Sequence, residues 1–210
     1  LKTSIHLDVN FQIGNVDPRI FGGFIEHMGR CIYGGIYEPE SEFADKDGYR
    51  KDVLEPLAQL NIPVVRYPGG NFASGYNWMD GIGDVKKRPV IRDFAWQSIE
   101  PNTFGTDEFI KLCNKMSWDP LITVNLGTGS PDMARNWVEY TNVVEGTKFS
   151  NLRCHNGNKE PFGVKLWCLG NEMDGDWQIG HVPAKNYAIK AQQAAKMMKD
   201  VDSSIETILC

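Results

Sequence analysis

The sequence predicts an α/β fold that forms the N-terminal half of a (β/α)8 barrel. Short β-rich apolar runs alternate with amphipathic helical stretches, a pattern typical of a parallel sheet with right-handed crossovers. The apolar runs end at polar, glycine-rich sequence, where a barrel places its catalytic side chains. The runs recur about every forty-five residues, so eight units would need roughly 370 residues. The chain has 210 residues and should therefore hold half a barrel plus one strand.

The elements follow in order along the chain. Residues 3–14 alternate apolar and polar side chains and predict a strand with one buried face. An open doubly wound sheet is disfavoured, because the sequence has neither a GxGxxG turn after the first strand nor a Walker A motif. Further strands are expected at 20–25, 62–67, 121–126, 164–169 and 205–209. Helices are expected over 53–60, from an N-cap at Thr106 to Met116, after Ser130-Pro131 and after Pro183.

The most informative strand end is Asn171-Glu172, directly after the apolar run 164–169. Trp167 and Trp177 are expected to form apolar walls around Glu172, and such surroundings favour the protonated carboxyl that a general acid needs. The alternative is an ordinary loop glutamate after a core strand.

Three other strand ends support the catalytic interpretation. The run 20–25 ends at Glu26-His27, the run 62–67 ends at residues 68–72, and the run 121–126 ends at 127–129. Because parallel strands present their carboxyl ends at one edge of the sheet, we expect these polar segments to lie together and form one polar surface there.

Composition excludes several classes of function. The net charge of -5 gives no electrostatic reason to expect nucleic acid or an anionic membrane as a partner, and no apolar run is long enough to span a bilayer. Five cysteines without a CxxC pair predict reduced, mostly structural thiols and a cytoplasmic protein. No metal site and no cofactor are expected.

Five ordered motifs carry a resemblance to a known family. They are Gly23-Phe24-Ile25-Glu26-His27, the segments 34–39, 66–72 and 74–78, and Trp167-Cys168-Leu169-Gly170-Asn171-Glu172-Met173-Asp174-Gly175. Together they resemble the α-L-arabinofuranosidases of glycoside hydrolase family 51. This resemblance implies a (β/α)8 barrel followed by a β-sandwich. Residues 1–15 would supply a strand to that sandwich, and residues 16–210 would form the first four barrel strands and the start of the fifth.

The resemblance also implies the chemistry. The family removes terminal arabinofuranosyl groups from arabinan, arabinoxylan and their oligosaccharides with retention of configuration. Glu172 would be the general acid/base, and the nucleophile would be a glutamate beyond residue 210. The implied roles of the other positions are hydroxyl binding by Glu26, Asn71 and Asn171, support of the nucleophile by Arg66, an aromatic platform at Trp96, and a wall beside the acid at Trp177 and Gln178. The segment 127–131 departs from the family pattern, and His27 and His181 are expected to be structural.

Two alternatives remain open. One is another glycosidase with an Asn-Glu acid, such as a β-xylosidase or an endoglucanase; the other is a carbohydrate-binding half-barrel without catalysis. Expected partners are an arabinose-containing saccharide, the C-terminal remainder of the enzyme and further copies of the chain, which the resemblance suggests form a hexamer.

Overall fold

A parallel sheet of five strands forms the centre of the computed structural model, which describes residues 2–210. The strands are β1 (Gly23–Phe24), β2 (Val64–Tyr67), β5 (Asp119–Val124), β6 (Leu166–Leu169) and β7 (Glu206–Ile208). Their order in space is β1-β2-β5-β6-β7, and every neighbouring pair is parallel. Spatial order therefore follows chain order, as it does in a (β/α)8 barrel and does not in a doubly wound sheet. The predicted half-barrel is confirmed.

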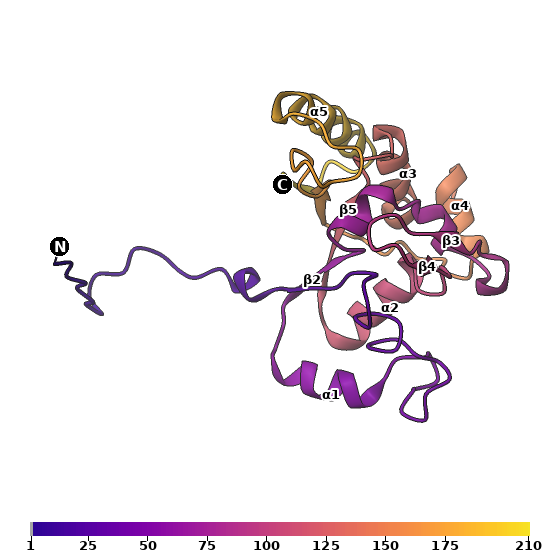
Figure 1. Ribbon diagram of the computed structural model, residues 1–210, viewed down its shortest axis with the longest axis horizontal. Helices are drawn as coiled ribbons and strands as arrows, with labels where there is room; N and C mark the ends of the chain where they lie inside the picture. The colour runs from indigo at the N-terminus through magenta and orange to yellow at the C-terminus, as the bar shows by residue number, and fades with distance from the viewer. Residues whose placement is uncertain (1) are drawn as a thin grey trace.

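Helices follow the strands and pack beside the sheet (Figure 1). They are α1 (Lys51–Gln59), α2 (Thr106–Met116), α3 (Pro131–Asn142), α4 (Lys148–His155) and α5 (Ala184–Val201). Helix α3 packs on both α4 and α5, α2 contacts β5, and α5 contacts β6. The loop between β2 and α2 also contains three 3-10 turns: η2 (Asn71–Gly75), η3 (Trp78–Gly81) and η4 (Val85–Lys87). A further 3-10 turn, η1 (Pro18–Phe21), precedes β1.

Of two N-caps predicted from the sequence, the structure confirms one and contradicts the other. Ser130 Oγ accepts a hydrogen bond from the Met133 amide at 3.1 Å, and Pro131 is the first residue of α3, as expected. Thr106 is not the N-cap of α2, because its hydroxyl accepts a hydrogen bond from the buried Trp137 Nε1 at 3.1 Å. Gly105 takes the cap position, and its amide donates to Glu108 Oε2 at 2.8 Å.

The two faces of the sheet differ in burial. Side chains on the helix-facing side are at most 2% exposed; they are Val65, Tyr67, Ile122, Val124, Trp167 and Leu169. Phe24 and Ile208, on the opposite face at the two ends of the sheet, are 49% and 40% exposed. In a closed barrel this second face is the interior. Strands β1 and β7 each have one edge without a partner strand within residues 2–210.

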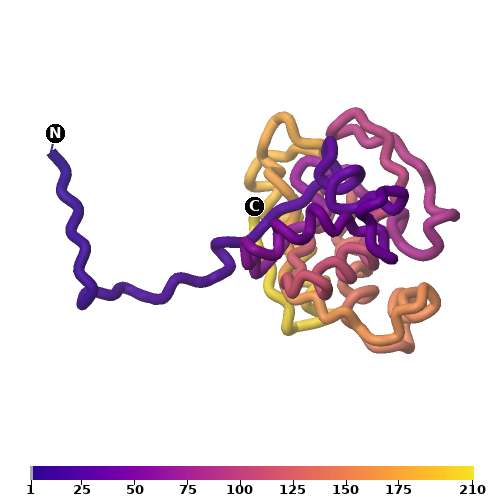
Figure 2. The backbone as a smooth tube through the Cα atoms, turned by 90° about the horizontal axis from the view of Figure 1, so that it is seen from below, coloured from indigo at the N-terminus to yellow at the C-terminus, as the bar shows by residue number. Residues whose placement is uncertain are grey.

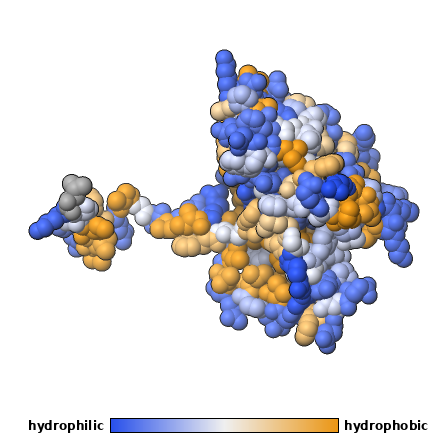
Figure 3. Space-filling model, viewed as in Figure 1, coloured by the Kyte–Doolittle hydropathy of each residue, from blue (hydrophilic) through white to orange (hydrophobic). Residues whose placement is uncertain are grey.

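The N-terminal segment differs from the sequence prediction. Residues 2–16 contain no strand and extend away from the rest of the molecule (Figure 2). Within residues 2–210 nothing covers the predicted buried face of this segment, since Ile5, Phe11 and Ile13 are 84%, 79% and 95% exposed. Apolar side chains line the extended arm in Figure 3, and no other strand within residues 2–210 lies alongside to cover them. The pairing of residues 1–15 with a C-terminal β-sandwich stays a prediction.

Two elements were not predicted. A short antiparallel hairpin joins β3 (Ile91–Arg92) to β4 (Ile99–Glu100) between β2 and α2. Helix α4 lacks a clear apolar stripe; it is held instead by the buried Arg153, which donates to the Tyr140 and Val143 carbonyls at 2.8 and 2.7 Å. All five cysteines are free thiols, in agreement with the expectation. Over residues 2–210, no helix combines the length and apolar character that crossing a membrane requires.

Candidate active site

Four of the predicted site residues meet at the carboxyl ends of β1, β2 and β6. Arg66 Nη2 donates to Asn171 Oδ1 at 2.5 Å, and Arg66 Nε donates to Thr123 Oγ1 on β5 at 2.9 Å. Asn171 Nδ2 lies 3.5 Å from Asn71 Oδ1. Glu26 contacts the turn that carries Asn71. We call Glu26, Arg66, Asn71 and Asn171 the strand-end cluster.

Glu26 fixes the turn that follows β2. Its carboxylate is buried, and Oε1 accepts hydrogen bonds from the Gly70 and Phe72 amides, both at 3.0 Å. Gly69 has a φ of +148°, and a Cβ at that position would overlap the Glu26 side chain. The second oxygen, Oε2, accepts no hydrogen bond from residues 2–210, so it remains available to a ligand hydroxyl.

Arg66 is held in place without a carboxylate. Its guanidinium carbon lies 5.1 Å from the centroid of the Phe24 ring, and Nη2 also donates to the Gly69 carbonyl at 3.2 Å. Within residues 2–210 no Asp or Glu oxygen comes within 4 Å of Arg66, so the chain supplies no structural ion pair for it. Because Nη1 donates no hydrogen bond in this part of the chain, the guanidinium can still bind an anionic group.

Glu172 projects from the loop after β6 into solvent. Its backbone is left-handed, with φ of +44°, an uncommon conformation for a residue other than glycine. The Gly175 amide donates to the Glu172 carbonyl at 2.8 Å, and the buried Met173 anchors the turn. Trp177 Nε1 donates to Glu172 Oε2 at 3.2 Å. The carboxylate is thus oriented by one indole and is accessible from solvent.

The expectation that Trp167 forms a wall beside Glu172 is wrong. Trp167 is fully buried on the helix-facing side of the sheet, where its ring packs edge-on against Trp137 with centroids 6.1 Å apart. Its Nε1 donates to the Val164 carbonyl at 3.1 Å. Strand alternation explains the difference, since a residue on this side of β6 faces away from the barrel interior.

The two remaining expected residues lie outside the strand-end cluster. Gln178 is 4% exposed; its amide donates to Ser74 Oγ, and its Oε1 has no partner in the described chain. Trp96 is 38% exposed in the turn of the β3–β4 hairpin. The Asp93 carboxylate shapes that turn by accepting hydrogen bonds from the Ala95 and Trp96 amides at 3.0 and 2.8 Å.

Polar residues that the sequence reasoning missed lock three loops together. Ser74 offers its carbonyl to both the amide and the hydroxyl of Thr128 at 3.0 Å. Asn125 Oδ1 accepts hydrogen bonds from the Gly127 and Gly129 amides at 2.9 and 3.0 Å. A Cβ on Gly180 would lie only 2.6 Å from Gly127 Cα, so these two backbones touch. The loops after β2, β5 and β6 are therefore packed against one another.

Beneath the strand-end cluster, His27 belongs to a buried network. Its Nδ1 lies 2.9 Å from Glu100 Oε2, although the contact is poorly directed as a hydrogen bond, and its ring stacks on Phe72 at 4.4 Å. Tyr33 Oη donates to Glu100 Oε1 at 2.5 Å. This network ties the end of β1 to the hairpin that carries Trp96, and the structural role expected for His27 stays a prediction. His181 is exposed and makes no side-chain hydrogen bond within residues 2–210. Across that same range, no three His, Cys, Asp or Glu side chains are grouped to hold a metal ion.

Parallel strands in sequential order, with carboxylate, amide and guanidinium groups at their carboxyl ends, define the catalytic face of a (β/α)8 barrel. Residues 56–210 match the family model described as the alpha-L-arabinofuranosidase 1 domain. The chain belongs to the α-L-arabinofuranosidases of glycoside hydrolase family 51.

Individual relatives agree with this assignment. The chain is 52% identical over 209 residues to intracellular exo-alpha-(1->5)-L-arabinofuranosidase 1 of Bacillus subtilis. The match covers 100% of the chain and 42% of that protein. The structure of the thermostable GH51 arabinofuranosidase from Thermotoga petrophila matches with 50% identity and a TM-score of 0.89, covering 91% of the chain and 40% of that structure. A family 51 enzyme from Bifidobacterium longum gives 45% identity and a TM-score of 0.92 over 94% of the chain and 39% of that structure. The chain thus spans about two-fifths of the length of these relatives.

Proposed function

We propose that the protein containing this chain is a retaining α-L-arabinofuranosidase in which Glu172 is the general acid/base. The observation that carries the proposal is the position of Glu172: an exposed carboxylate at a strand end, oriented by Trp177, directly after the Asn171 that belongs to the strand-end cluster. In this mechanism Glu172 protonates the departing glycosidic oxygen and later removes a proton from water.

The nucleophile in this proposal is a carboxylate from chain beyond residue 210, held about 5–5.5 Å from Glu172 as retention requires. Arg66 is suited to support it, because Nη1 is free and the guanidinium has no carboxylate partner within residues 2–210. A cation beside the nucleophile keeps that carboxylate ionised.

The proposed sugar contacts start from Glu26 Oε2, which is free to accept a hydrogen bond from a furanose hydroxyl. The Asn71 and Asn171 side chains lie side by side, and each keeps an amide proton or oxygen lone pair with which it is proposed to bind a further hydroxyl. The exposed ring of Trp96 is proposed as an apolar platform for the leaving-group sugar, and Trp177 is proposed as a wall beside Glu172. Gln178 was expected in this set; its burial against Ser74 favours a positioning role, for which a test is given in the Discussion.

The proposed substrates are terminal arabinofuranosyl groups of arabinan, arabinoxylan and their oligosaccharides. Several relatives are named as intracellular exo-acting enzymes on α-(1→5) linkages, which supports linear arabinan fragments and a cytoplasmic location. The complete protein is proposed to contain the second half of the barrel and a β-sandwich, and to form homo-oligomers. The alternatives of a β-xylosidase, an endoglucanase or a non-catalytic binding protein lose support from the family assignment.

Replacing Glu172 tests the proposal. In the full-length protein, Glu172→Ala should abolish most hydrolysis of natural arabinosides but spare kcat/KM for aryl arabinofuranosides with good leaving groups, whose departure needs little protonation. On the aryl substrates kcat should still fall, because the glycosyl-enzyme intermediate has lost its general base, and azide should partly restore kcat by attacking that intermediate. Asp174→Ala, which removes an exposed carboxylate two residues away, is the matched control and should keep wild-type activity. Equal loss on both substrate types without azide rescue would rule out the acid/base role.

A further inference from the structure

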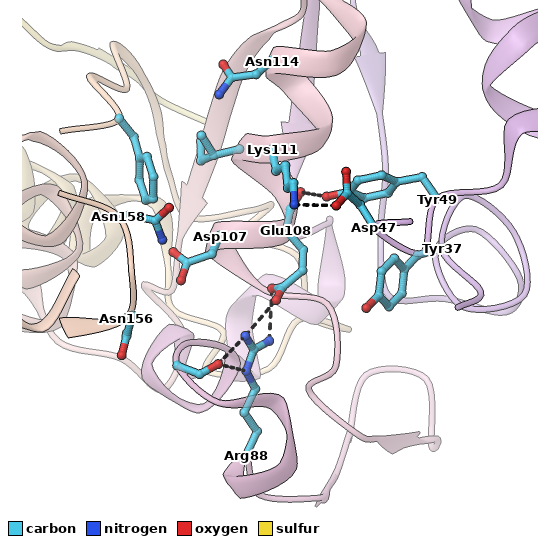
Figure 4. A pocket seen from close by; sticks show the side chains of 13 residues that line it. Tyr37, Asp47, Tyr49, Arg88, Asp107, Glu108, Lys111, Asn114, Asn156 and Asn158 are labelled. Carbon is cyan, nitrogen blue, oxygen red and sulfur yellow. Dashed lines mark hydrogen bonds and ion pairs between the residues drawn. The ribbon is translucent and has the colours of Figure 1, made fainter. Parts of the chain in front are cut away.

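A pocket of about 440 Å³ lies on the outer face of α2 and shares no residue with the strand-end cluster. Its walls come from the loop before α1, from the segment around Gly83 and Arg88, from α2, and from the end of α4 and the segment after it (Figure 4). All of these walls lie in the sequence between β1 and β6. They therefore do not include the free edges of β1 and β7, where further barrel strands would pair.

The fixed charges of this pocket are already paired. Arg88 donates to the two oxygens of Glu108 at 2.8 and 3.1 Å, and Lys111 Nζ lies 2.7 Å from Asp47 Oδ1. Asp107 accepts hydrogen bonds from Tyr140 Oη at 2.9 and 3.0 Å, and burial raises the pKa of Asp107 to about 6. Arg88 and Lys111 are thus both neutralised by carboxylates of the pocket, so neither favours an anionic ligand.

The groups that remain free are neutral. Tyr37 is 8% exposed, and its hydroxyl points into the pocket without a hydrogen-bond partner in residues 2–210 (Figure 4). Burial, with Glu108 nearby, raises the pKa of Tyr37, so the hydroxyl stays protonated and can donate. The side-chain amides of Asn114 and Asn158 also make no hydrogen bond in the described chain and line the same space. The partly exposed ring of Phe162 completes the lining.

We propose that this pocket is a second, non-catalytic saccharide-binding site, which takes a neutral sugar unit. Sugar hydroxyls both donate and accept hydrogen bonds, and so do the free amides and the tyrosine hydroxyl here. A ring such as Phe162 can cover the apolar face of a sugar. The volume lies in the range of small-molecule sites. Such a site would retain a long saccharide near the enzyme while its terminal residue is cleaved elsewhere.

The test uses the full-length protein with Glu172→Gln, so that the probe is not consumed. A linear arabinan oligosaccharide is titrated by calorimetry; this choice of probe rests on the proposed function, and a xylan oligosaccharide is titrated in parallel. Tyr37→Phe and Asn158→Ala are compared with Asn186→Ala, an exposed asparagine on α5. Because the Tyr37 hydroxyl has no intramolecular partner, Tyr37→Phe should leave the melting temperature unchanged. In the enzyme with Glu172 intact it should also leave hydrolysis of an aryl arabinofuranoside unchanged.

The expected result is two binding events for at least one of the two oligosaccharides. Tyr37→Phe and Asn158→Ala should each weaken only the second event by about fivefold to tenfold, the value of one lost hydrogen bond. A single binding event, or equal affinities for Tyr37→Phe, Asn158→Ala and Asn186→Ala, would overturn the proposal. Calcium binding that depends on Asp107 and not on Tyr37, without a second saccharide event, would identify a cation site and would also overturn it. Loss of the proposed enzymatic function would appear separately, as absence of aryl arabinofuranoside hydrolysis with Glu172 intact.

Discussion

Arg66 Nη2 and Asn171 Oδ1 are joined by a hydrogen bond of 2.5 Å, which links β2 to the residue that precedes Glu172. The same guanidinium is fixed by Thr123 on the strand between them. The Arg66 side chain therefore connects the ends of β2, β5 and β6 by hydrogen bonds, and its Nη1 remains free to bind an anion.

Arg66→Lys should lower kcat at least tenfold, because an ammonium cannot hold Thr123 and Asn171 while also facing a nucleophile. That factor corresponds to about 1.4 kcal/mol of transition-state stabilisation. Steady-state kinetics of the full-length protein on an aryl arabinofuranoside measure it, with a melting curve to verify folding. A lysine variant with wild-type kcat would show that charge alone is sufficient at this position.

Asn71→Ala should reduce kcat/KM by an amount equivalent to roughly 1–3 kcal/mol, the usual effect of leaving a polar partner unpaired. The expectation rests on the position of Asn71 beside Asn171, directly after the turn that Glu26 fixes. Asn186→Ala on α5 controls for loss of an exposed amide. Wild-type kcat/KM in Asn71→Ala would refute the sugar contact.

Gln178→Ala should lower kcat and change KM little, because its buried amide holds the loop of Glu172 against Ser74. Ser74→Ala should have a similar effect, and the double variant should lose less than the sum of the two single losses. Additive losses, or a raised KM with unchanged kcat, would indicate that Gln178 contacts the sugar directly.

Asp107→Asn should stabilise the protein near neutral pH. Burial raises the pKa of Asp107 from 3.8 to about 6, so the folded state holds a proton that the unfolded state has released between these values. Below pH 4 the Asp107 carboxyl is protonated in both states and does not lower the free energy of unfolding. As the pH rises from 4 through 6, that free energy falls, because only the unfolded state ionises easily. The advantage of Asp107→Asn should therefore be small at pH 4 and reach about 3 kcal/mol above pH 6.5, since the shift is about two pKa units and one unit equals about 1.4 kcal/mol. Thermal unfolding between pH 4 and 8 measures it, and a constant difference across that range would contradict the assignment.

Residues 1–210 expressed alone should be inactive and poorly soluble. Strands β1 and β7 have free edges, and the apolar side chains of residues 5–13 are exposed. Supplying the remainder of the protein as a second polypeptide should restore both solubility and hydrolysis. A monomeric, active 210-residue protein would mean that either the half-barrel or the catalytic pair is misassigned.

Periodicity was sufficient for the parts of the fold that bury regular apolar patterns. The five strands and the helices α1, α2, α3 and α5 lie close to their expected positions, because buried strands and amphipathic helices carry strong signals. Helix α4 was missed because a buried arginine with backbone partners holds it in place of an apolar stripe. The segment 3–14 alternates as a strand does, but alternation cannot supply the partner strand that would cover one face.

The candidate site was only partly visible in the sequence. Strand ends identified Glu26, Asn171 and Glu172, since polar residues after apolar runs are conspicuous. The same alternation that places Arg66 on the inner face also places Thr123 there, and that signal was overlooked. The alternation of side chains along β6 places Trp167 on the opposite face, away from Glu172. The roles of Ser74 and Asn125 depend on contacts between distant loops, which no local pattern reports.

The contact between Gly127 and Gly180 determines where the site can change during evolution or engineering. Any side chain at Gly127 would meet the Ile179 and Ser74 carbonyls at 2.5 Å, so substitutions and insertions there would displace the loop that carries Glu172. The turn that carries Trp96 is not packed against these loops. It joins two strands of two residues each, and the hydrogen bonds that shape it come from Asp93 within the same turn. Variation in which saccharides are accepted should accumulate in that hairpin, while the three packed loops preserve the chemistry.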